Sequence, residues 1–439
     1  MAGAPRSESA SAPRGPRDPR AIAVEVVRRV ADERAYSNRV LTALLERSGL
    51  PVRDRQLATE LSYGTLRRLV GIDRVLEPLL ERPLEAAPPQ ARAALRVGAH
   101  QLLHTRIPAH AAVAETVTAA PRPQRGFVNA VLRRVAAGPP PAPPAGKEDE
   151  AISARTGLTP WAVGELRLLL GDEGEAAARA LASPGPLTLR ANTCRTTPEE
   201  LEERLRGAGL EPRRGSLHAG SVRLSGGSPT SLPGFPEGWF AVQDEASAYV
   251  VDVLDPQPDD LVLDAAAGPG GKTADIACRA GAVVAADLSE PRTRLVRETA
   301  ERLGGTAVLL VQDAARPALR EGFDRVLLDA PCSGIGAARR RPELLWRPER
   351  RHLSGLARLQ VRLALGAASL LRPGGVFVYS VCTFPRAETD AACDALLAKA
   401  PWLRPDPLLG PEGETADRVR LWPHRHGTDA MFVARFVRE

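Results

Sequence analysis

Apolar residues recur at helical spacing through residues 20–137. Ile22, Val26, Val27 and Val30 form one such set, and the region shows no strand-like alternation of apolar and polar residues. A repeat of three to four residues places apolar side chains on one face of a helix. The pattern therefore predicts an all-α domain over residues 20–137. Residues 1–19 lack this pattern and are predicted to be a disordered tail.

The helical pattern is interrupted at residues 138–150, GPPPAPPAGKEDE. This segment has too few large apolar residues to pack, so we predict a semi-rigid linker there. Residues 151–238 then combine two helical stretches with short strands such as LTLRAN. Thr197 and Glu200 have the spacing of a capping box at the start of a helix. We interpret residues 151–238 as a small α+β module.

From residue 239 the pattern changes to short apolar runs that alternate with helical stretches. The apolar runs are LVLDAAA, AVVAAD, AVLLVQD, RVLLDAP, GVFVYSVC and FVARFV. Such alternation is typical of parallel βαβ units with helices on both faces of a sheet. We therefore predict an α/β, Rossmann-like domain over residues 239–439.

Chemically active side chains follow five of these predicted strands. They are Asp264, Asp287, Asp313, Asp329 and Cys382. Ligands of open parallel sheets bind beyond the carboxyl ends of the strands. We therefore expect these side chains to lie along one rim of the sheet.

The composition narrows the choice of partners and compartment. The formal net charge of +6 and the pI of about 9.4 permit RNA as a partner without requiring it. No apolar run reaches the ~18 residues of a membrane span. The five cysteines have no CxxC or Cys/His spacing, so we expect neither a disulfide framework nor a metal site, and we expect a cytoplasmic protein.

The glycine-rich turn in LVLDAAAGPGGKTADIA allows two interpretations. Residues 266–273 fit a relaxed P-loop, with Ala266 in place of the first glycine. Only three of the 59 basic residues are lysines, so Lys272 within this turn stands out. Pro269, however, removes one of the backbone donors that a phosphate cradle needs.

The second interpretation is a nucleoside cofactor such as S-adenosylmethionine. Asp287 ends the next strand about 20 residues later, where a carboxylate binds ribose hydroxyls, and Asp313 is placed to meet an adenine edge. A turn, a ribose carboxylate and a further acid after three successive strands fit such a cofactor better than they fit ATP.

Two thiols follow neighbouring strands, Cys332 in LLDAPCSGIG and Cys382 in YSVC. Methylation of a pyrimidine at carbon 5 needs such a thiolate, because addition to carbon 6 converts the ring into a nucleophilic enamine. Asp329 would bind the cytosine N3/N4 edge, and a second thiol would assist release. These residues alone do not decide which thiol attacks. We interpret Cys194, Cys278 and Cys393 as small buried residues.

The motifs DAAAGPGGKT, LLDAPCSG and YSVCTFPRAET resemble those of the RsmB (Fmu/Sun) family of bacterial 16S rRNA cytosine-5 methyltransferases. The segments RAYSNRVLTALLE, ELSYGTLRR and GFVNAVLRRV are similar to the NusB-like RNA-binding domain of that family. The resemblance covers residues 20–439. It implies that the protein methylates one cytosine of 16S rRNA, at rRNA position 967, and that the α+β module binds RNA. Nothing in the sequence demands more than a monomer.

The resemblance also implies a role for each motif residue. It assigns the nucleophile to Cys382 and product release to Cys332, with Asp329 and Lys272 as further catalytic residues; Lys272 either holds the substrate or steadies the cofactor turn. The residues implied to bind S-adenosylmethionine are Ala266, Ala267, Gly268, Pro269, Gly270, Gly271, Lys272, Asp287, Asp313 and Asp329.

This chain departs from the family pattern at two places. Ala266 stands where a cysteine is common, and of the Pro-Glu-Glu-Asn stretch after the nucleophile only Glu388 is retained. Two other functions fit parts of the sequence: an RNA-associated P-loop ATPase, and an RNA-binding ribosome-assembly factor.

Overall fold

The computed structural model describes residues 18–138, 142 and 144–439. The predicted disordered tail falls outside the described residues except for its last two, and part of the predicted linker also falls outside them. The chain forms two compact units. The first comprises the described residues up to Thr159 together with Arg341–Trp346, and the second comprises Pro160–Arg340 and Arg347–Glu439.

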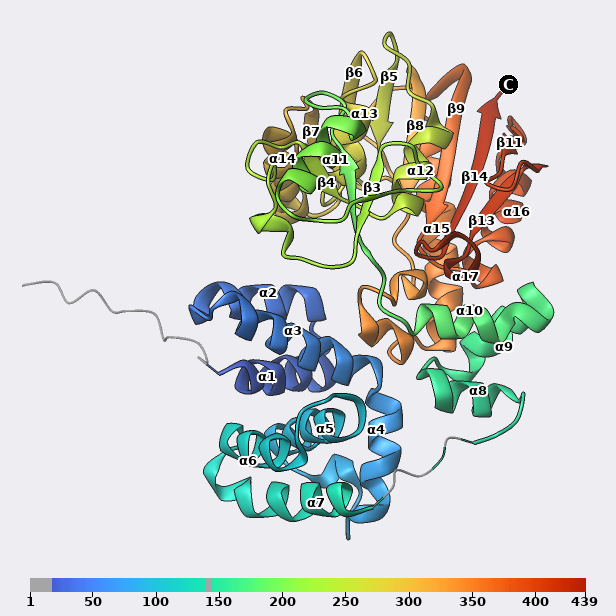
Figure 1. Cartoon of the computed structure of the whole chain (residues 1–439). Coiled ribbons are helices and arrows are strands. Elements are labelled where there is room, and N and C mark those ends of the chain that lie inside the picture. The colour runs from blue at the N-terminus through green and yellow to red at the C-terminus, as the bar shows by residue number, and fades with distance from the viewer. Residues whose placement is uncertain (1–17, 139–141, 143) are drawn as a thin grey trace, which may run out of the picture. The chain divides into compact units, whose positions relative to one another are not determined.

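The first unit is built from helices, as the apolar spacing predicted (Figure 1). Ile22, Val26, Val27 and Val30 are all completely buried in its core. Asp18 caps the first helix, because its carboxylate accepts a hydrogen bond from the backbone N–H of Ala21 at 2.8 Å. The helices are α1 (Pro19–Asp32), α2 (Ser37–Ser48), α3 (Val52–Arg67), α4 (Leu69–Leu76), α5 (Pro89–His104), α6 (Ala109–Ala119), α7 (Arg125–Ala137) and α8 (Asp149–Thr156).

A short segment from late in the sequence completes this helical unit. The 3-10 helix η7 (Pro342–Leu345) carries Glu343, which is buried and accepts a hydrogen bond from the backbone N–H of Ser37 at 3.1 Å. The indole N–H of Trp346 donates to the carbonyl of Leu66 at 3.0 Å. The chain therefore leaves the second unit after Arg340 and re-enters it at Arg347.

The second unit begins with helices α9 (Pro160–Leu170) and α10 (Gly174–Leu181) and a small antiparallel sheet. Its strands lie in the order β2-β3-β1-β4, with bounds β1 (Leu187–Ala191), β2 (Arg213–Arg214), β3 (Ser221–Leu224) and β4 (Phe240–Val242). Thr197 and Glu200 form the predicted capping box of α11 (Pro198–Gly207). Residues 151–182 hold three helices instead of two, because Gly157, at φ 75°, ends α8 in the left-handed conformation.

A larger sheet forms the centre of the second unit, with strand order β10-β14-β9-β8-β5-β6-β7 and β13 paired to β14. The strands are β5 (Leu261–Asp264), β6 (Ala282–Asp287), β7 (Val308–Val311), β8 (Phe323–Asp329), β9 (Leu371–Val381), β10 (Leu403–Pro405), β13 (Arg418–Leu421) and β14 (Met431–Arg438). Strands β5 to β9 are parallel. This confirms the predicted Rossmann-like arrangement.

The prediction of parallel pairing is wrong for FVARFV, the core of β14. This strand pairs antiparallel with both β9 and β13. Residues 422–430, between β13 and β14, are fewer than the dozen or so that a parallel crossover needs. An apolar run has the same appearance in either direction, so the pattern could not show the reversal.

Successive residues of the central strands point to opposite faces of the sheet. Val326 and Leu328 pack with α15 (Arg350–Ala368) and α16 (Asp390–Lys399), whereas Leu327 packs with α12 (Glu245–Leu254). Helices α13 (Gly271–Ile276) and α14 (Glu290–Leu303) contact the β5, β6 and β7 side of the sheet. Figure 1 shows helices on both faces. The remaining elements are β11 (Leu408–Leu409), β12 (Thr415–Ala416) and α17 (Pro423–His426).

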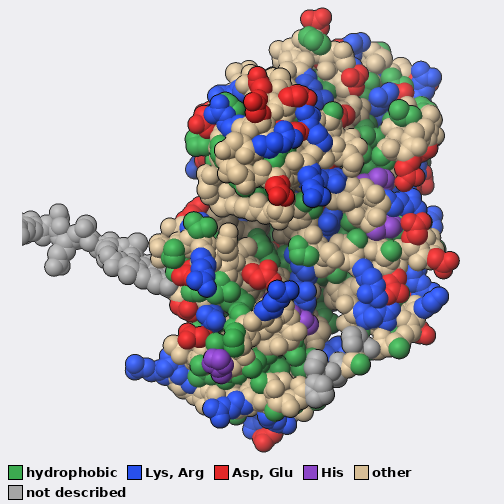
Figure 2. Space-filling view, viewed as in Figure 1, with side chains coloured by type: hydrophobic (Ala, Val, Ile, Leu, Met, Phe, Trp, Pro, Cys, Tyr) green, Lys and Arg blue, Asp and Glu red, His purple; other side chains and the backbone are tan. Residues whose placement is uncertain are grey.

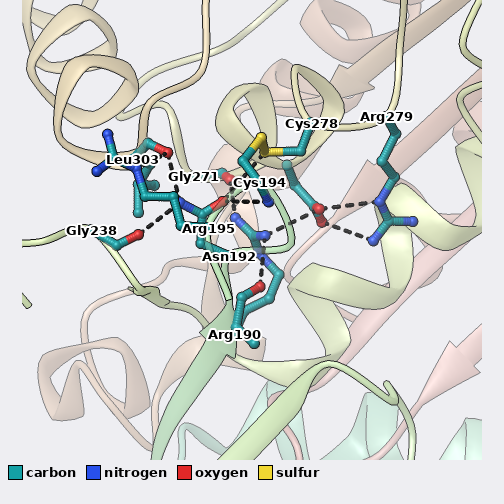
Figure 3. Close-up of a disulfide and its surroundings, with 11 residues drawn as sticks. Arg190, Asn192, Cys194, Arg195, Gly238, Gly271, Cys278, Arg279 and Leu303 are labelled. Carbon is teal, nitrogen blue, oxygen red and sulfur yellow. Dashed lines mark hydrogen bonds and ion pairs between the residues drawn. A yellow bond between two sulfur atoms is a disulfide. The ribbon is translucent and has the colours of Figure 1, made fainter. Parts of the chain in front are cut away.

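Cys194 and Cys278 form a disulfide, although nothing in the sequence indicated one (Figure 3). Their interpretation as small buried residues is also wrong, because Cys194 is exposed and Cys278 is partly exposed. Their separation of 84 residues gives no signal in the sequence, since only folding brings the loop after β1 to the end of α13, with the Cα atoms 5.4 Å apart. Beside the disulfide, the Asn192 amide donates to the carbonyls of Leu303 and Gly238 at 2.6 and 2.7 Å. Cys393 is buried, as predicted.

Candidate active site

The glycine-rich turn joins β5 to α13 and depends on two glycines. Gly270 has φ 102°, and a Cβ there would lie 2.9 Å from the Val296 Cα. A Cβ on Gly268 would lie 2.8 Å from the Asp287 carboxylate and 2.7 Å from the Arg292 guanidinium. A side chain at position 268 would therefore clash where the turn meets the end of β6, and one at position 270 would clash with α14.

Asp287 ends β6 and contacts the turn directly. Its Oδ2 accepts hydrogen bonds from the Gly268 backbone N–H at 3.1 Å and from the Arg292 Nε at 2.9 Å, while Oδ1 accepts from the Ser289 N–H at 3.0 Å. Arg292 also donates to the Gly268 carbonyl at 2.6 Å. Sequence reasoning missed Arg292, although its place in the first turn of the helix after an acidic strand end was a usable signal.

Asp313 lies beyond the end of β7, beside β6 but without a direct bond to Asp287. Its Oδ1 accepts from the Ala315 N–H at 2.9 Å. The neighbouring Gln312 N–H donates to the Asp287 carbonyl at 3.1 Å, so the two strand ends adjoin. Within the turn, the Ala267 N–H donates to the Ala286 carbonyl at 2.9 Å. The structure thus brings the residues predicted to bind the cofactor to one rim.

Lys272 at the start of α13 pairs with Asp329 at the end of β8. The Lys272 Nζ lies 2.6 Å from the Asp329 Oδ2, and the Ser380 hydroxyl donates to the Asp329 Oδ1 at 3.0 Å. Burial lowers the pKa of Lys272, but the charges of Asp329, Asp264 and Cys382 outweigh it and raise that pKa overall. The ammonium group is therefore held charged and bonded to Asp329, whereas the lysine of a P-loop meets phosphates.

Asp264 lies close enough to Lys272 and Asp329 for their charges to interact. It is buried at the end of β5, and its Oδ2 accepts from the Thr273 hydroxyl at 2.7 Å. Burial raises the pKa of Asp264 to about 6, against the opposing effects of Thr273 and Lys272. The hydrogen bond from Thr273 thereby links the start of α13 to the end of β5, on either side of the turn.

The two candidate thiols face each other. The Cys332 and Cys382 sulfur atoms are 3.5 Å apart, and both residues are partly exposed. The shared hydrogen bond with Cys382 is the main reason why the pKa of Cys332 is raised, and burial and the nearby charges of Glu388 and Asp329 raise it further. The Cys382 carbonyl accepts from the Gly336 N–H at 3.1 Å, which ties the loop after Cys332 to the end of β9.

Behind the thiols lies a buried hydrogen-bond network that the sequence alone did not reveal. Glu388 is completely buried and accepts hydrogen bonds from Ser333, Thr383 and Gln360. Glu388 is the one residue of the family's Pro-Glu-Glu-Asn stretch that this chain retains, but its position in the sequence does not indicate what it does. Gln360 lies within α15, and its spacing carried no signal because a glutamine on a helix is usually solvated.

The helical unit has two basic stretches, TLRRLVGIDR and RPQRGFVNAVLRRV, whose arginines either meet phosphates or form a solvated helix face. Arg67 is 7% exposed, whereas Arg68, Arg133 and Arg134 are exposed. Figure 2 shows basic side chains interspersed with acidic ones over the face in view. The distribution of charged side chains on that face therefore does not indicate where RNA would bind.

Two features are absent from the described ranges, 18–138, 142 and 144–439. No helix of those ranges combines the length and apolarity needed to cross a membrane. The same residues contain no cluster of three or more His, Cys, Asp or Glu side chains able to hold a metal ion.

A parallel sheet with a glycine turn after its first strand and acidic residues after the strands that follow defines a Rossmann-like methyltransferase domain. Family models match along the chain: the NusB family over residues 17–137, an RsmF/B-like ferredoxin-like domain over 159–231, and 16S rRNA methyltransferase RsmB/F over 251–437.

Individual relatives match over almost their whole length. The chain is 39% identical to the putative methyltransferase Rv1407 of Mycobacterium tuberculosis, over 97% of this chain and 98% of the relative. It is 34% identical to the probable ribosomal RNA small subunit methyltransferase B of Bacillus subtilis, over 94% and 97%. The solved structure of PH0851 is 25% identical, with a TM-score of 0.82, and the match covers 97% of this chain and all of that one.

These matches extend through the helical region, the small sheet and the central sheet together. The chain belongs to the RsmB/F family of 16S rRNA methyltransferases.

Proposed function

We propose that this protein transfers a methyl group from S-adenosylmethionine to carbon 5 of a cytosine in 16S rRNA through a covalent cysteine–cytosine intermediate. The observation that carries the proposal is the pair of sulfur atoms 3.5 Å apart, next to the Lys272–Asp329 ion pair. Family membership supports rRNA as the substrate. The choice of rRNA position 967 rests on the family resemblance.

The turn and the strand ends suit S-adenosylmethionine. The Asp287 Oδ2 is occupied by the Gly268 N–H and Arg292, whereas Oδ1 keeps a lone pair for a ribose hydroxyl beyond its bond to Ser289. Asp313 would meet the adenine edge. When bound, the cofactor supplies an electrophilic methyl group. The residues that would hold it are Ala266, Ala267, Gly268, Pro269, Gly270, Gly271, Lys272, Asp287, Asp313 and Asp329.

Each catalytic side chain has a distinct task in this proposal. The Cys382 thiolate adds to carbon 6 of the cytosine, and the ring becomes an enamine whose carbon 5 takes up the methyl group. Asp329 accepts from the cytosine amino group, and the Lys272 ammonium offsets negative charge that develops on the ring. Once Cys332 has lost its own proton to solvent, its thiolate takes the proton from carbon 5. The electron pair of that carbon–hydrogen bond reforms the double bond between carbons 5 and 6, and Cys382 leaves as a thiolate.

The target base must leave any stack to reach these thiols. We propose that the NusB-like helical unit and the ferredoxin-like module bind the surrounding rRNA, and that the protein acts as a monomer in the cytoplasm. We also propose that the domains follow the predicted boundaries, with the helical domain ending at residue 137, the linker at 150 and the small module at 238.

Substitution of each thiol tests the assignment. Cys382→Ala should abolish methyl transfer to 16S rRNA because no covalent activation remains. Cys332→Ala should accumulate a covalent protein–RNA complex on denaturing gels because the adduct cannot resolve. Equal loss of activity in both variants without any adduct would reject the assignment.

The site of methylation is tested in the cell. Bisulfite mapping of rRNA from strains with and without the gene should show one 16S cytosine that loses its 5-methyl group when the gene is absent. An unchanged map would contradict the proposed substrate.

A further inference from the structure

The buried carboxylate of Glu388 connects the two loops that carry the thiols. Glu388 lies in the 3-10 helix η8 (Arg386–Glu388), shortly after Cys382. Its Oε1 accepts from the Ser333 backbone N–H at 2.8 Å and from the Gln360 Nε2 at 3.0 Å; its Oε2 accepts from the Ser333 hydroxyl at 2.6 Å and from the Thr383 hydroxyl at 3.5 Å. Four donors therefore satisfy a group that is 0% exposed.

The position of Glu388 is itself fixed by the central sheet. The hydroxyl of Tyr379, in β9, donates to the Glu388 carbonyl at 2.8 Å. Gln360, in α15, donates from its Nε2 to the Pro331 carbonyl at 3.0 Å as well as to Glu388. Residues on both sides of Cys332 are thus hydrogen-bonded to one rigid group, Pro331 through Gln360 and Ser333 directly.

Cys382 depends less on Glu388, because the bond from the neighbouring Thr383 hydroxyl to the carboxylate is long, at 3.5 Å, whereas the bonds from Ser333 are 2.6 and 2.8 Å. Cys382 follows β9 without a break, and its carbonyl is bonded to the Gly336 N–H. Loss of the Glu388 carboxylate should therefore release the loop around Cys332 more than it releases Cys382.

We propose that Glu388 is a positioning residue that holds Cys332 at its distance from the Cys382 sulfur and thereby sets the rate of product release. The proposal rests on the proposed function, because the step that Glu388 affects is the one assigned to Cys332. Glu388 itself takes no part in the chemistry. Glu388 acts through hydrogen bonds. Their loss should slow the step that Cys332 performs and leave the attack by Cys382 in place.

The test uses the full-length chain with a 16S rRNA fragment and S-adenosylmethionine. Glu388→Ala should lower multiple-turnover methylation by about tenfold to a hundredfold, the range that misplacement of a reacting group produces. Methyl transfer in a single turnover should stay within about threefold of wild type, and a covalent protein–RNA complex should accumulate. In Glu388→Gln the amide oxygen can accept from the Ser333 N–H and from Gln360 in place of Oε1, and the amide NH2 can donate to the Ser333 hydroxyl in place of Oε2, because a hydroxyl can also accept. Turnover should therefore return to within about threefold of wild type.

Two variants guard against a folding defect. Asp324→Ala removes a carboxylate that accepts from the Leu261 N–H at the amino end of β8, at the opposite end of the strand from Asp329. It should lower the melting temperature without accumulating adduct. Ser333→Ala removes one hydroxyl from the network and should accumulate adduct even if Glu388→Ala does not fold.

Three outcomes overturn the proposal. They are normal turnover by Glu388→Ala, adduct accumulation by Glu388→Gln equal to that by Glu388→Ala, and loss of single-turnover transfer in a folded Glu388→Ala. Failure of the proposed function is recognised separately, because Cys332→Ala would then fail to accumulate adduct whatever the Glu388 variants do.

Discussion

Individual charges at the strand ends are set by burial and by single partners. Lys272 keeps its proton because it lies 2.6 Å from Asp329. Burial raises the pKa of Asp264, although the hydrogen bond from the Thr273 hydroxyl opposes that rise. The pKa of Cys332 rises because it shares a hydrogen bond with Cys382 and lies near carboxylates. Neighbouring residues therefore hold different protonation states within one site, as acid–base work requires.

The raised pKa of Asp264 predicts a pH-dependent stability. The folded state holds this proton more tightly than the unfolded state, so the contribution of Asp264 is most favourable below pH 3.8 and is lost as the pH rises through about 6. The difference corresponds to roughly 3 kcal/mol. Asp264→Asn keeps an acceptor for Thr273 and should remove this part of the pH dependence. Urea unfolding of both proteins at pH 4 and pH 7 measures it.

The result is taken as a difference between the two proteins, because other carboxylates titrate in the same range. The stability of the variant relative to wild type should improve between pH 4 and pH 7. A constant difference across this range would show that Asp264 does not carry the shift.

At the scale of elements, the apolar runs predicted the strands and the order of their chemically active ends. Asp264, Asp287, Asp329 and Cys382 stand where the runs placed them, because the alternation of strands and helices fixes which ends share a rim. The direction of β14 was not predictable, since pairing is a property of two strands and not of one run.

Contacts between distant elements were also hidden. The Glu388 network joins β9, α15 and the loop after β8, and each member has an ordinary spacing along the chain. The disulfide likewise joins the loop after β1 to the end of α13. Such contacts depend on how the elements pack, so they appear only once the tertiary structure is known.

The disulfide predicts a response to reductant. A link across 84 residues restricts the unfolded chain and typically stabilises a protein by about 2–4 kcal/mol. Dithiothreitol should therefore lower the melting temperature of the protein purified without reductant. The double variant with Cys194→Ser and Cys278→Ser should not respond, whereas Cys393→Ser, a change outside the disulfide, should respond like wild type.

Titration of the free thiols under denaturing conditions tests the disulfide independently of the melting temperature. Three reactive thiols are expected before reduction, those of Cys332, Cys382 and Cys393. Five thiols before reduction, with no change in melting temperature on reduction, would contradict the disulfide.

At the scale of the whole molecule, the chain combines a helical unit with a catalytic unit and shares one segment between them. The residues after Cys332 leave the second unit at Arg340, form part of the helical core through η7, and return at Arg347. The sequence predicted both units from their different apolar periods. It did not predict the exchanged segment, because RPELLW has the apolar content of an ordinary loop or short helix.

The central claim is that Cys382 forms the bond to the target cytosine. A 16S rRNA fragment transcribed with 5-fluorocytidine carries fluorine where the proton must leave, so methyl transfer should trap the covalent complex. Mass spectrometry of the digested complex, formed by the wild-type chain with S-adenosylmethionine, then locates the bond. The account predicts a methylated fluorocytosine on Cys382, and its absence when the cofactor is omitted. A bond to Cys332, or no trapped complex with an rRNA fragment that is methylated when unsubstituted, would contradict it.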